Sequence, residues 1–489
     1  MSIEKFFKSY WKLMLFSFVA VTVASLSSPF YPYNFYGDTN AWFTVGRGMC
    51  EGKLPYADFV DHKGPVLYFL YYLLALLGNN TFLGIYLFEI VCSISVIVSL
   101  YKSLELLGSS RSELLSMLGL LVLLCSSGYG YGGTVEIYTM AFVMPGIYLF
   151  IRKTVLGEDI TLFESCYFGL AVGIVFWMKF NLSALVLLPL AYMIGKGCIE
   201  DRQKEAVRLL MVATGCFFLV YGVVYWYCDV TGILEQMKLQ YFFYNLHDNP
   251  NGFSFLAVIK GIPDTVISVL RGFGAETLLI ILGFWRFREK EYKDIRRFFG
   301  IYFMVVGAML CLNRFHFLYY TVILMPAVIL GLYVLGELIP CKPVKMIPLT
   351  GILAAGVFLP MMFSQSFDTV RMSKAQEYGL SKLAPHILER KDSTLLCFGM
   401  MDEGFYYLFD KKPIARNFFK CNLSEPQYRK AYLDETFKVV SAHKADYILT
   451  YDEDHNLEKY GYKVVEKVAL LNNNRLISYR LYESPVAKR

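Results

Sequence analysis

Long apolar runs dominate this 489-residue chain and restrict it to one broad class of fold. A helix needs about 20 mostly apolar residues to cross the hydrocarbon core of a bilayer, and on that measure we expect about eleven membrane-spanning helices. They are predicted near residues 13–30, 82–101, 112–128, 134–151, 163–178, 181–198, 207–227, 273–287, 298–312, 317–337 and 345–363. The run at 65–77 is too short to span, and we predict an amphipathic or re-entrant helix at the outer face.

The composition agrees with a membrane protein. Hydrophobic residues make up 56% of the chain and charged residues only 18%, whereas soluble domains carry about a quarter charged residues. The net charge of +6 could suggest a nucleic-acid partner. We exclude that partner and expect a lipid bilayer instead, because the basic residues gather at the ends of apolar runs, where they orient helices. The eleven cysteines form no C-x-x-C pair and no zinc spacing, so we expect no disulfide framework.

The basic residues also predict the orientation. Lys and Arg are concentrated in alternate gaps, such as residues 4–12, 195–208 and 286–297, and such gaps face the cytoplasm. We therefore expect a multi-pass protein of the cytoplasmic (inner) membrane with a cytoplasmic N-terminus. Residues 1–363 are predicted to be the transmembrane domain, with an outer loop at 31–80, and residues 364–489 an extracytoplasmic soluble domain.

The tail after Phe363 has the pattern of a small α/β domain. Helical spacing at 373–391 is followed by a β-type run at 393–400, and Ser424 and Pro426 begin a second predicted helix. Further strands are predicted at 445–452 and, as a hairpin, at 463–483. Strand–helix–strand order predicts some parallel sheet.

The first outer loop carries most of the ionisable residues that lie near membrane depth, and such residues are candidates for a functional site. Asp38 could accept a proton from a hydroxyl, bind a divalent metal, or cap a helix. Downstream, "YADFVDHKGP" contains Asp61, His62 and Lys63. Lys63 is suited to a phosphate, and His62 could pair with a carboxylate; the alternative is a solvated loop at the membrane boundary.

Two other outer gaps add candidates. Glu136 is the only charge in "GYGYGGTVEIY", and it could also be a first-turn helix acid. The stretch "NRFHFLYYTVILMP" holds Arg314, His316, Tyr319 and Tyr320. The lone Arg could bind a phosphate or pyrophosphate, or could snorkel to the interface. A proton-coupled transporter would more often place charges in helix middles, which are nearly free of charge here.

The segment "GDTNAWFTVGRGMCEGKLPYADFVDHKGPVLYFLYYLLAL" resembles the first outer loop of bacterial GT-C glycosyltransferases of the protein-mannosyltransferase-like group, which includes the lipid A aminoarabinose transferases. Weaker agreement follows in "GGTVEIYTMAFVMPGIYLF" and "FHFLYYTVILMPAVILG". The resemblance implies an enzyme that transfers a sugar from a polyprenyl-phosphate carrier to a hydroxyl of a glycan, lipid or protein acceptor, with inversion and without a nucleotide sugar.

The resemblance also implies residue roles. Asp38 would be the general base. Lys63, Arg314 and His316 would bind the donor phosphate. The substrate would be contacted by Asp61, His62, Glu136, Tyr319 and Tyr320. Many relatives have an acidic pair beside the first Asp, whereas Thr39 and Asn40 follow Asp38 here. A divalent metal therefore stays open, and no other cofactor is expected.

Three other functions predict different sequence features. A lipid-linked oligosaccharide polymerase or ligase would show a larger, Arg-rich outer loop late in the chain. A non-enzymatic flippase or transporter of lipid-linked sugar would show intramembrane charges and repeated halves. A membrane-anchored binding module would need one span only. Within the tail, Asp402 and Glu403 follow a predicted strand and are a minor catalytic alternative.

Overall fold

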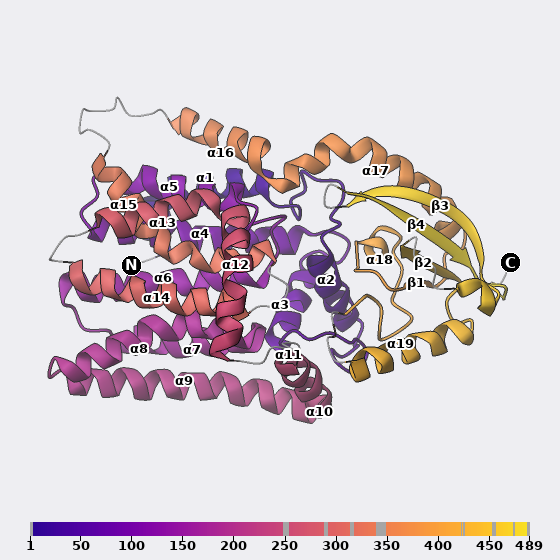
Figure 1. Cartoon of the computed structure of the whole chain (residues 1–489), viewed down its shortest axis with the longest axis horizontal. Helices are drawn as coiled ribbons and strands as arrows, with labels where there is room; N and C mark the ends of the chain where they lie inside the picture. The colour runs from indigo at the N-terminus through magenta and orange to yellow at the C-terminus, as the bar shows by residue number, and fades with distance from the viewer. Residues whose placement is uncertain are drawn as a thin grey trace. The chain divides into compact units, whose positions relative to one another are not determined.

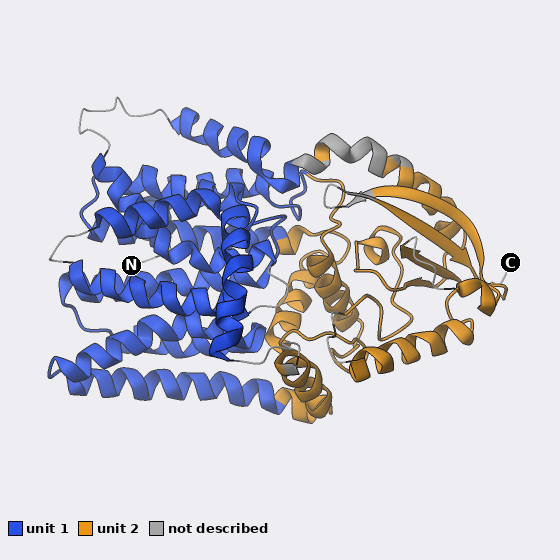
Figure 2. Ribbon diagram, viewed as in Figure 1, with its two compact units in different colours: residues 1–30, 86–226, 251–367 blue, residues 31–85, 227–250, 368–489 orange. Residues whose placement is uncertain are grey.

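The computed structural model describes residues 3–247, 254–287, 292–312, 317–338, 349–421, 423, 426–451, 456–472 and 475–486. The chain forms two compact units, which Figure 2 shows in different colours. Unit 1 comprises residues 1–30, 86–226 and 251–367, and unit 2 comprises residues 31–85, 227–250 and 368–489.

Unit 1 is built from apolar helices (Figure 1). It holds all or most of α1 (Ile3–Ala24), α4 (Leu83–Leu106), α5 (Ser112–Cys125), α6 (Val135–Leu156), α7 (Leu162–Met178), η1 (Phe180–Leu182), α8 (Ser183–Ile199), α9 (Gln203–Val230), α12 (Phe255–Gly272), α13 (Gly274–Arg286), α14 (Lys293–Leu312), η4 (Leu318–Ala327), α15 (Val328–Leu338) and α16 (Leu349–Phe363). Every apolar run predicted to span the membrane coincides with one of these helices, although the first helix begins and ends earlier than expected.

By length and hydropathy, seven helices within the described residues could cross a membrane, and an eighth if the bent pair α12–α13 is one span. Helices α5, α7 and α16 are apolar but shorter. The chain is therefore a multi-pass membrane protein, and the predicted fold class is confirmed.

Small residues bring the helices of unit 1 close together. A Cβ on Gly331 of α15 would lie 2.0 Å from the carbonyl oxygen of Leu279 on α13. Likewise, a Cβ on Gly169 of α7 would lie 2.2 Å from the carbonyl oxygen of Ala213 on α9. Glycine at these positions permits the backbone approach that membrane helices use in place of a hydrophobic driving force.

Unit 2 combines the first loop, the segment 227–250 and the tail. Its helical elements are α2 (Gly37–Cys50), α3 (Pro65–Leu76), α10 (Leu234–Met237), the π-helix η2 (Lys238–Phe243), α11 (Tyr244–His247), most of α17 (Gln365–Leu388), α18 (Phe405–Leu408), α19 (Pro426–Ser441) and η5 (Leu457–Tyr460). Its strands are β1 (Leu395–Cys397), β2 (Tyr447–Tyr451), β3 (Lys463–Asn472) and β4 (Arg475–Glu483).

The four strands form one sheet in the order β1-β2-β4-β3. Strands β1 and β2 are parallel, and the β2–β4 and β3–β4 pairs are antiparallel. The α/β tail with a parallel pair is thus confirmed. The predicted cap Ser424 lies outside the described residues. The core between the sheet and α19 is closed by buried apolar side chains, among them Leu396, Phe398, Val440, Ile448 and Tyr482.

The first loop packs against the tail within unit 2. The hydroxyl of Thr44 on α2 donates a 2.6 Å hydrogen bond to Oδ2 of Asp402. Arg47 forms a 2.9 Å ion pair with Asp410. The loop also closes on itself: α2 and α3 meet so tightly that a Cβ on Gly46 would lie 2.6 Å from the carbonyl oxygen of Tyr71. Helix α2 is thereby held between α3 and the tail.

Candidate active site

Asp61 is the buried centre of a polar cluster in unit 2, with 4% of its surface exposed. It lies on the loop between α2 and α3. Its Oδ2 accepts a 2.7 Å hydrogen bond from the hydroxyl of Tyr68, and its Oδ1 accepts one of 2.7 Å from the N–H of His62. The N–H of Asp61 donates to Oε1 of Gln240 at 3.2 Å. Burial raises the pKa of Asp61, although the charge of Lys63 and these hydrogen bonds act in the opposite direction.

Lys63 is fixed where the chain enters α3. Its N–H donates to the hydroxyl of Tyr68 at 3.1 Å, and its carbonyl accepts from Tyr56 at 2.6 Å. Gly64 and Pro65 then begin the helix, since proline suits its first position. The ammonium lies 3.1 Å from Nε2 of His62 and 5.7 Å from the centre of the Trp42 ring. The loop therefore presents one cation in a fixed place.

These contacts determine which ring nitrogen of His62 carries the proton. An ammonium can only donate, so Nε2 of His62 accepts from Lys63 and the neutral ring carries its proton on Nδ1. Nδ1 lies 3.4 Å from Sγ of Cys421 and 3.5 Å from Oδ1 of Asp61. His62 thus connects the cation to the buried carboxylate. The carbonyl of His62 accepts a 2.6 Å hydrogen bond from the side chain of Asn245 of α11, which holds the backbone of His62 in place.

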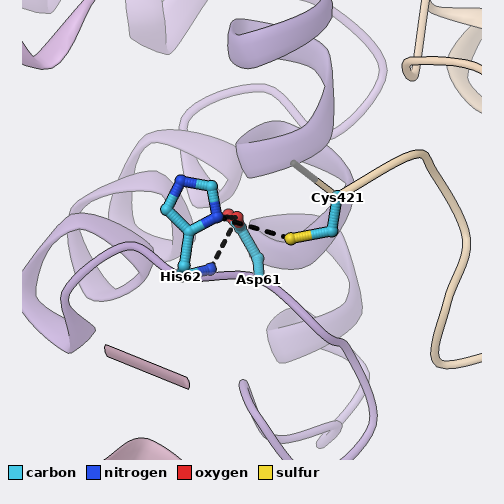
Figure 3. Close-up of side chains that lie close together, drawn as sticks. All are labelled: Asp61, His62 and Cys421. Atoms are coloured by element: carbon cyan, nitrogen blue, oxygen red, sulfur yellow. Dashed lines mark hydrogen bonds and ion pairs between the residues drawn. The ribbon is translucent and has the colours of Figure 1, made fainter. Parts of the chain in front are cut away.

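Asp61, His62 and Cys421 could also hold a metal ion (Figure 3). One ligand atom from each lies within 4.8 Å of the others, and within the described part of the chain this is the one such group of three. An imidazole nitrogen, a thiolate and a carboxylate suit zinc, and three protein ligands leave a fourth position open. Binding through Nδ1 would move the His62 proton to Nε2 and so end its bond from Lys63.

Asp38 lies in the first turn of α2 and is half-buried. The cap position of that helix belongs to Tyr36, so the predicted capping role is wrong in position, and Asp38 sits where the helix dipole favours a carboxylate. Residues four apart share a helix face. Asp38 is therefore one turn from Trp42, the ring that meets the ammonium of Lys63.

A second group of predicted residues lies in unit 1. Thr134 caps α6 by accepting from the N–H of Ile137, which places Glu136 in the first turn. Glu136 is 2% exposed, and its Oε1 accepts a 2.6 Å hydrogen bond from Nζ of Lys179. The same ammonium lies 4.4 Å from the centre of the Tyr320 ring. The carboxylate, the cation and the aromatic ring form one connected set.

The structure thus brings the candidates together in two groups. Asp61, His62 and Lys63 meet in unit 2, where Asp38 also lies. Glu136 meets Tyr320 through Lys179 in unit 1, and the rings of Tyr319 and Tyr320 are 4.7 Å apart. The predicted phosphate-binding residues Arg314 and His316 lie outside the described residues.

The tail carboxylates are engaged internally. Asp402 is fully buried and accepts from Thr44 and from the N–H of Gly404, at 2.6 and 3.1 Å. Its burial raises its pKa to about 6. Glu403 accepts from the hydroxyls of Tyr451 and Tyr479. Both side chains stabilise the unit from within, which favours a structural role over the catalytic alternative.

Some residues in contact with these groups carry no mark in the sequence. Gln240 and Cys421 are 179 and 359 residues away from their partners in the loop, and no local pattern marks them. Glu89 of α4 could have been found, because a lone Glu stands in an otherwise apolar run. It is fully buried, and a Cβ on Gly132 would come within 3.0 Å of its carboxylate.

Comparisons with known proteins agree with this picture. Residues 62–226 match the family model described as dolichyl-phosphate-mannose-protein mannosyltransferase. No curated protein matches the sequence. Among solved structures, ArnT from Cupriavidus metallidurans bound to undecaprenyl phosphate has a TM-score of 0.63 at 13% identity, over 98% of this chain and 99% of that chain. ArnT from the same organism in the apo state gives 0.59 at 13% identity, over 99% of each chain.

The fold of ArnT therefore extends over nearly the whole chain, the tail included. The family match begins at His62, inside the buried cluster, and runs through Glu136 and Lys179. The resemblance to GT-C glycosyltransferases that the first loop predicts is confirmed.

Proposed function

We propose that this chain is a membrane glycosyltransferase that moves a sugar from a polyprenyl-phosphate carrier to an acceptor hydroxyl. The observation that carries the proposal is the fixed ammonium of Lys63, next to His62 and a buried carboxylate, in a chain with the ArnT fold. The ArnT structure holds undecaprenyl phosphate, and a compact ammonium is a suitable partner for such a phosphate.

The proposed reaction is a displacement with inversion at the anomeric carbon. The acceptor oxygen forms the new bond to that carbon while the bond from the carbon to the phosphate oxygen breaks. Asp38 takes the proton of the hydroxyl as general base. The leaving polyprenyl phosphate gains negative charge, which Lys63 stabilises as it develops, with Arg314 and His316 as further donors.

The remaining candidates would position the substrates. Asp61 and His62 hold Lys63, and Glu136 with Tyr319 and Tyr320 would contact the sugar or the acceptor. The donor sugar is a hexose or a pentose, and the acceptor belongs to a glycan, a lipid or a protein. We place the reaction at the outer face of the cytoplasmic membrane, with the N-terminus in the cytoplasm, because of the distribution of Lys and Arg.

A divalent metal is a second part of the proposal. Asp61, His62 and Cys421 would hold it, and at that position it would supply positive charge for the substrate phosphate.

One observation favours an alternative. Glu89 is a fully buried carboxylate within an apolar helix, a feature typical of transporters. A flippase of lipid-linked sugar would move its substrate between leaflets without cleaving it. Polyprenyl phosphate would then not be released.

The test is turnover by the full chain in lipid nanodiscs with a radiolabelled polyprenyl-phosphate sugar and an acceptor extract. We expect release of polyprenyl phosphate, and a loss of about 10²-fold or more in kcat for Asp38→Asn, as for other general bases. Asp58→Asn is the matched control, because Asp58 is exposed and its carboxylate accepts from the N–H of Leu54 in the same loop. Full activity of Asp38→Asn would remove Asp38 from the mechanism.

A further inference from the structure

Helix α12 of unit 1 has three distinct faces. Its N-terminus is capped by Ser254, which accepts from the N–H of Ala257. One face is buried and consists of the small residues Ala257, Gly261, Thr265 and Gly272. This face packs against α14 so closely that a Cβ on Gly261 would lie 2.1 Å from the carbonyl oxygen of Cys311. The buried face therefore fixes α12 on the bundle.

A second face is apolar and exposed. Spacings of three and four residues place its side chains on one side of the helix. The exposed fractions are 46% for Ile259, 46% for Ile262, 50% for Val266 and 59% for Leu270. A surface of this kind is unstable in water and needs an apolar partner.

A third face is charged. Lys260, Asp264 and Arg271 follow one another at intervals of four and seven residues, and all three are exposed. They form a strip between the apolar face and the buried face. Three exposed charges along one strip are costly in hydrocarbon, whereas an apolar face bordered by a polar strip is typical of a helix at a membrane surface.

The direction of α12 agrees with this pattern. The chain bends by 106° between α12 and α13. Helix α13 packs along α15, which belongs to a membrane-spanning segment. Figure 1 shows α12 running across the direction of α6, α9 and α14. Helix α12 is thus nearly perpendicular to the helices that cross the bilayer.

The bend is fixed by close contacts. The N–H of Gly128 donates a 2.6 Å hydrogen bond to the carbonyl of Gly272. A Cβ on Gly272 would lie 2.9 Å from Oγ1 of Thr321 on η4. The end of α12 is therefore held by the glycine-rich loop that leads to Glu136 and by the segment that carries Tyr320.

We propose that α12 lies flat in the lipid–water interface and that its partner is the phospholipid surface itself. The apolar face enters the boundary between headgroups and acyl chains, and Lys260 and Arg271 lie at the level of the lipid phosphates. The spanning helices also expose apolar side chains, such as Leu219 of α9, and the exposed face of α12 has the same apolar character. Helices α12 and α13 are then an interfacial helix followed by a membrane helix, and not two halves of one span.

The test measures depth in the bilayer at both ends of α12. A fluorescent amino acid replaces Ile259 or, separately, Leu270 in the full chain, reconstituted in vesicles of phosphatidylethanolamine and phosphatidylglycerol. Nitroxide lipids labelled at the headgroup, at carbon 5 or at carbon 12 of the acyl chain then quench the fluorescence. The same label at Lys260 is the matched control on the charged strip, and at Leu219 it reports a spanning helix. Size-exclusion chromatography first shows that each labelled protein elutes at the same volume as the wild type and is therefore folded.

For an interfacial helix we expect Ile259 and Leu270 to give the same quenching ratio, with the carbon-5 label most effective at both. Lys260 should be quenched chiefly by the headgroup label and Leu219 more strongly by the carbon-12 label. A spanning α12 would separate Ile259 and Leu270 by roughly 16 Å in depth, because a helix rises 1.5 Å per residue. Different ratios at the two positions would overturn the proposal, and so would the absence of lipid quenching at both, as expected if protein covers this face.

Discussion

The hydroxyl of Tyr68 joins two residues of the loop that precedes α3: it donates to Oδ2 of Asp61 at 2.7 Å and accepts from the N–H of Lys63 at 3.1 Å. Through this one atom, α3 holds both the buried carboxylate and the residue that carries the cation. The position of the Lys63 backbone therefore depends on a hydrogen bond that a single oxygen atom supplies.

Tyr68→Phe removes that oxygen and leaves a buried carboxylate and a buried N–H each short of a partner. The expected cost is about 1–3 kcal/mol of stability, with a raised KM for the lipid-phosphate donor because Lys63 is no longer fixed. Thermal unfolding in detergent and steady-state kinetics measure the two effects. Tyr72→Phe, on the same helix, is the control and should change neither. An unchanged KM for Tyr68→Phe would argue against a role of Lys63 geometry in donor binding.

Asp402 predicts a pH dependence of the stability of unit 2. Burial raises the pKa of Asp402 to about 6, from its ordinary value of 3.8, so the folded state binds this proton more tightly than the unfolded state. The stabilisation is complete below about pH 4 and is lost as the pH rises through about 6. Its size is on the order of 3 kcal/mol.

Hydrogen exchange of β1 and α18 at several pH values between 4 and 7 would measure this change. Protection should fall with rising pH in the wild type, and Asp402→Asn should remove most of the slope. Asp410→Asn, whose side chain is 83% exposed, should keep the wild-type slope. A wild-type profile that is flat across this range would show that Asp402 is not protonated in the folded state.

The ion pair of Glu136 and Lys179 predicts strong coupling between the two residues. Lys179→Met leaves the buried Glu136 carboxylate without its cation, at a cost of up to about 3–5 kcal/mol, and Glu136→Gln should cost less because Lys179 is partly exposed. The double variant should cost less than the sum of the two single variants. Unfolding of the four proteins in detergent gives the coupling energy directly. Additive single effects would show that the 2.6 Å contact contributes little.

Metal binding can be tested on Cys421. After loading with zinc and dialysis, we expect zinc bound to the wild type and less zinc per protein in Cys421→Ser. Inductively coupled plasma mass spectrometry measures the zinc content. Cys198→Ser replaces an exposed cysteine of α8 and is the control. Equal zinc content in all three proteins would exclude the group of Asp61, His62 and Cys421 as the metal site.

The sequence predicts well what depends on local pattern. Run length and hydropathy locate the membrane helices, and the Gly64–Pro65 pair marks where the chain turns into α3 beside Lys63. The strand and helix order of the tail predicts the parallel pair of β1 and β2. The first two of these signals are complete within about 20 neighbouring residues, and the third is a succession of such local patterns.

What depends on tertiary contact was not predictable in the same way. Cys421 and Gln240 reach the loop from distant parts of the chain, and their own neighbours in sequence carry no mark of it. Helix α12 was not predicted for another reason. Lys260, Asp264 and Arg271 bring three charges into its 18 residues, which is unfavourable for a membrane span, although the division of the helix into three faces is regular.

The most direct test of the central claim identifies the phosphate species that leaves the donor. The full chain in nanodiscs receives, in separate reactions, a polyprenyl-phosphate sugar, a polyprenyl-pyrophosphate sugar and a nucleotide sugar, each with the same acceptor extract. The account predicts turnover of the first donor only, with polyprenyl monophosphate as the lipid product. Release of polyprenyl pyrophosphate, or turnover that requires the nucleotide sugar, would contradict it.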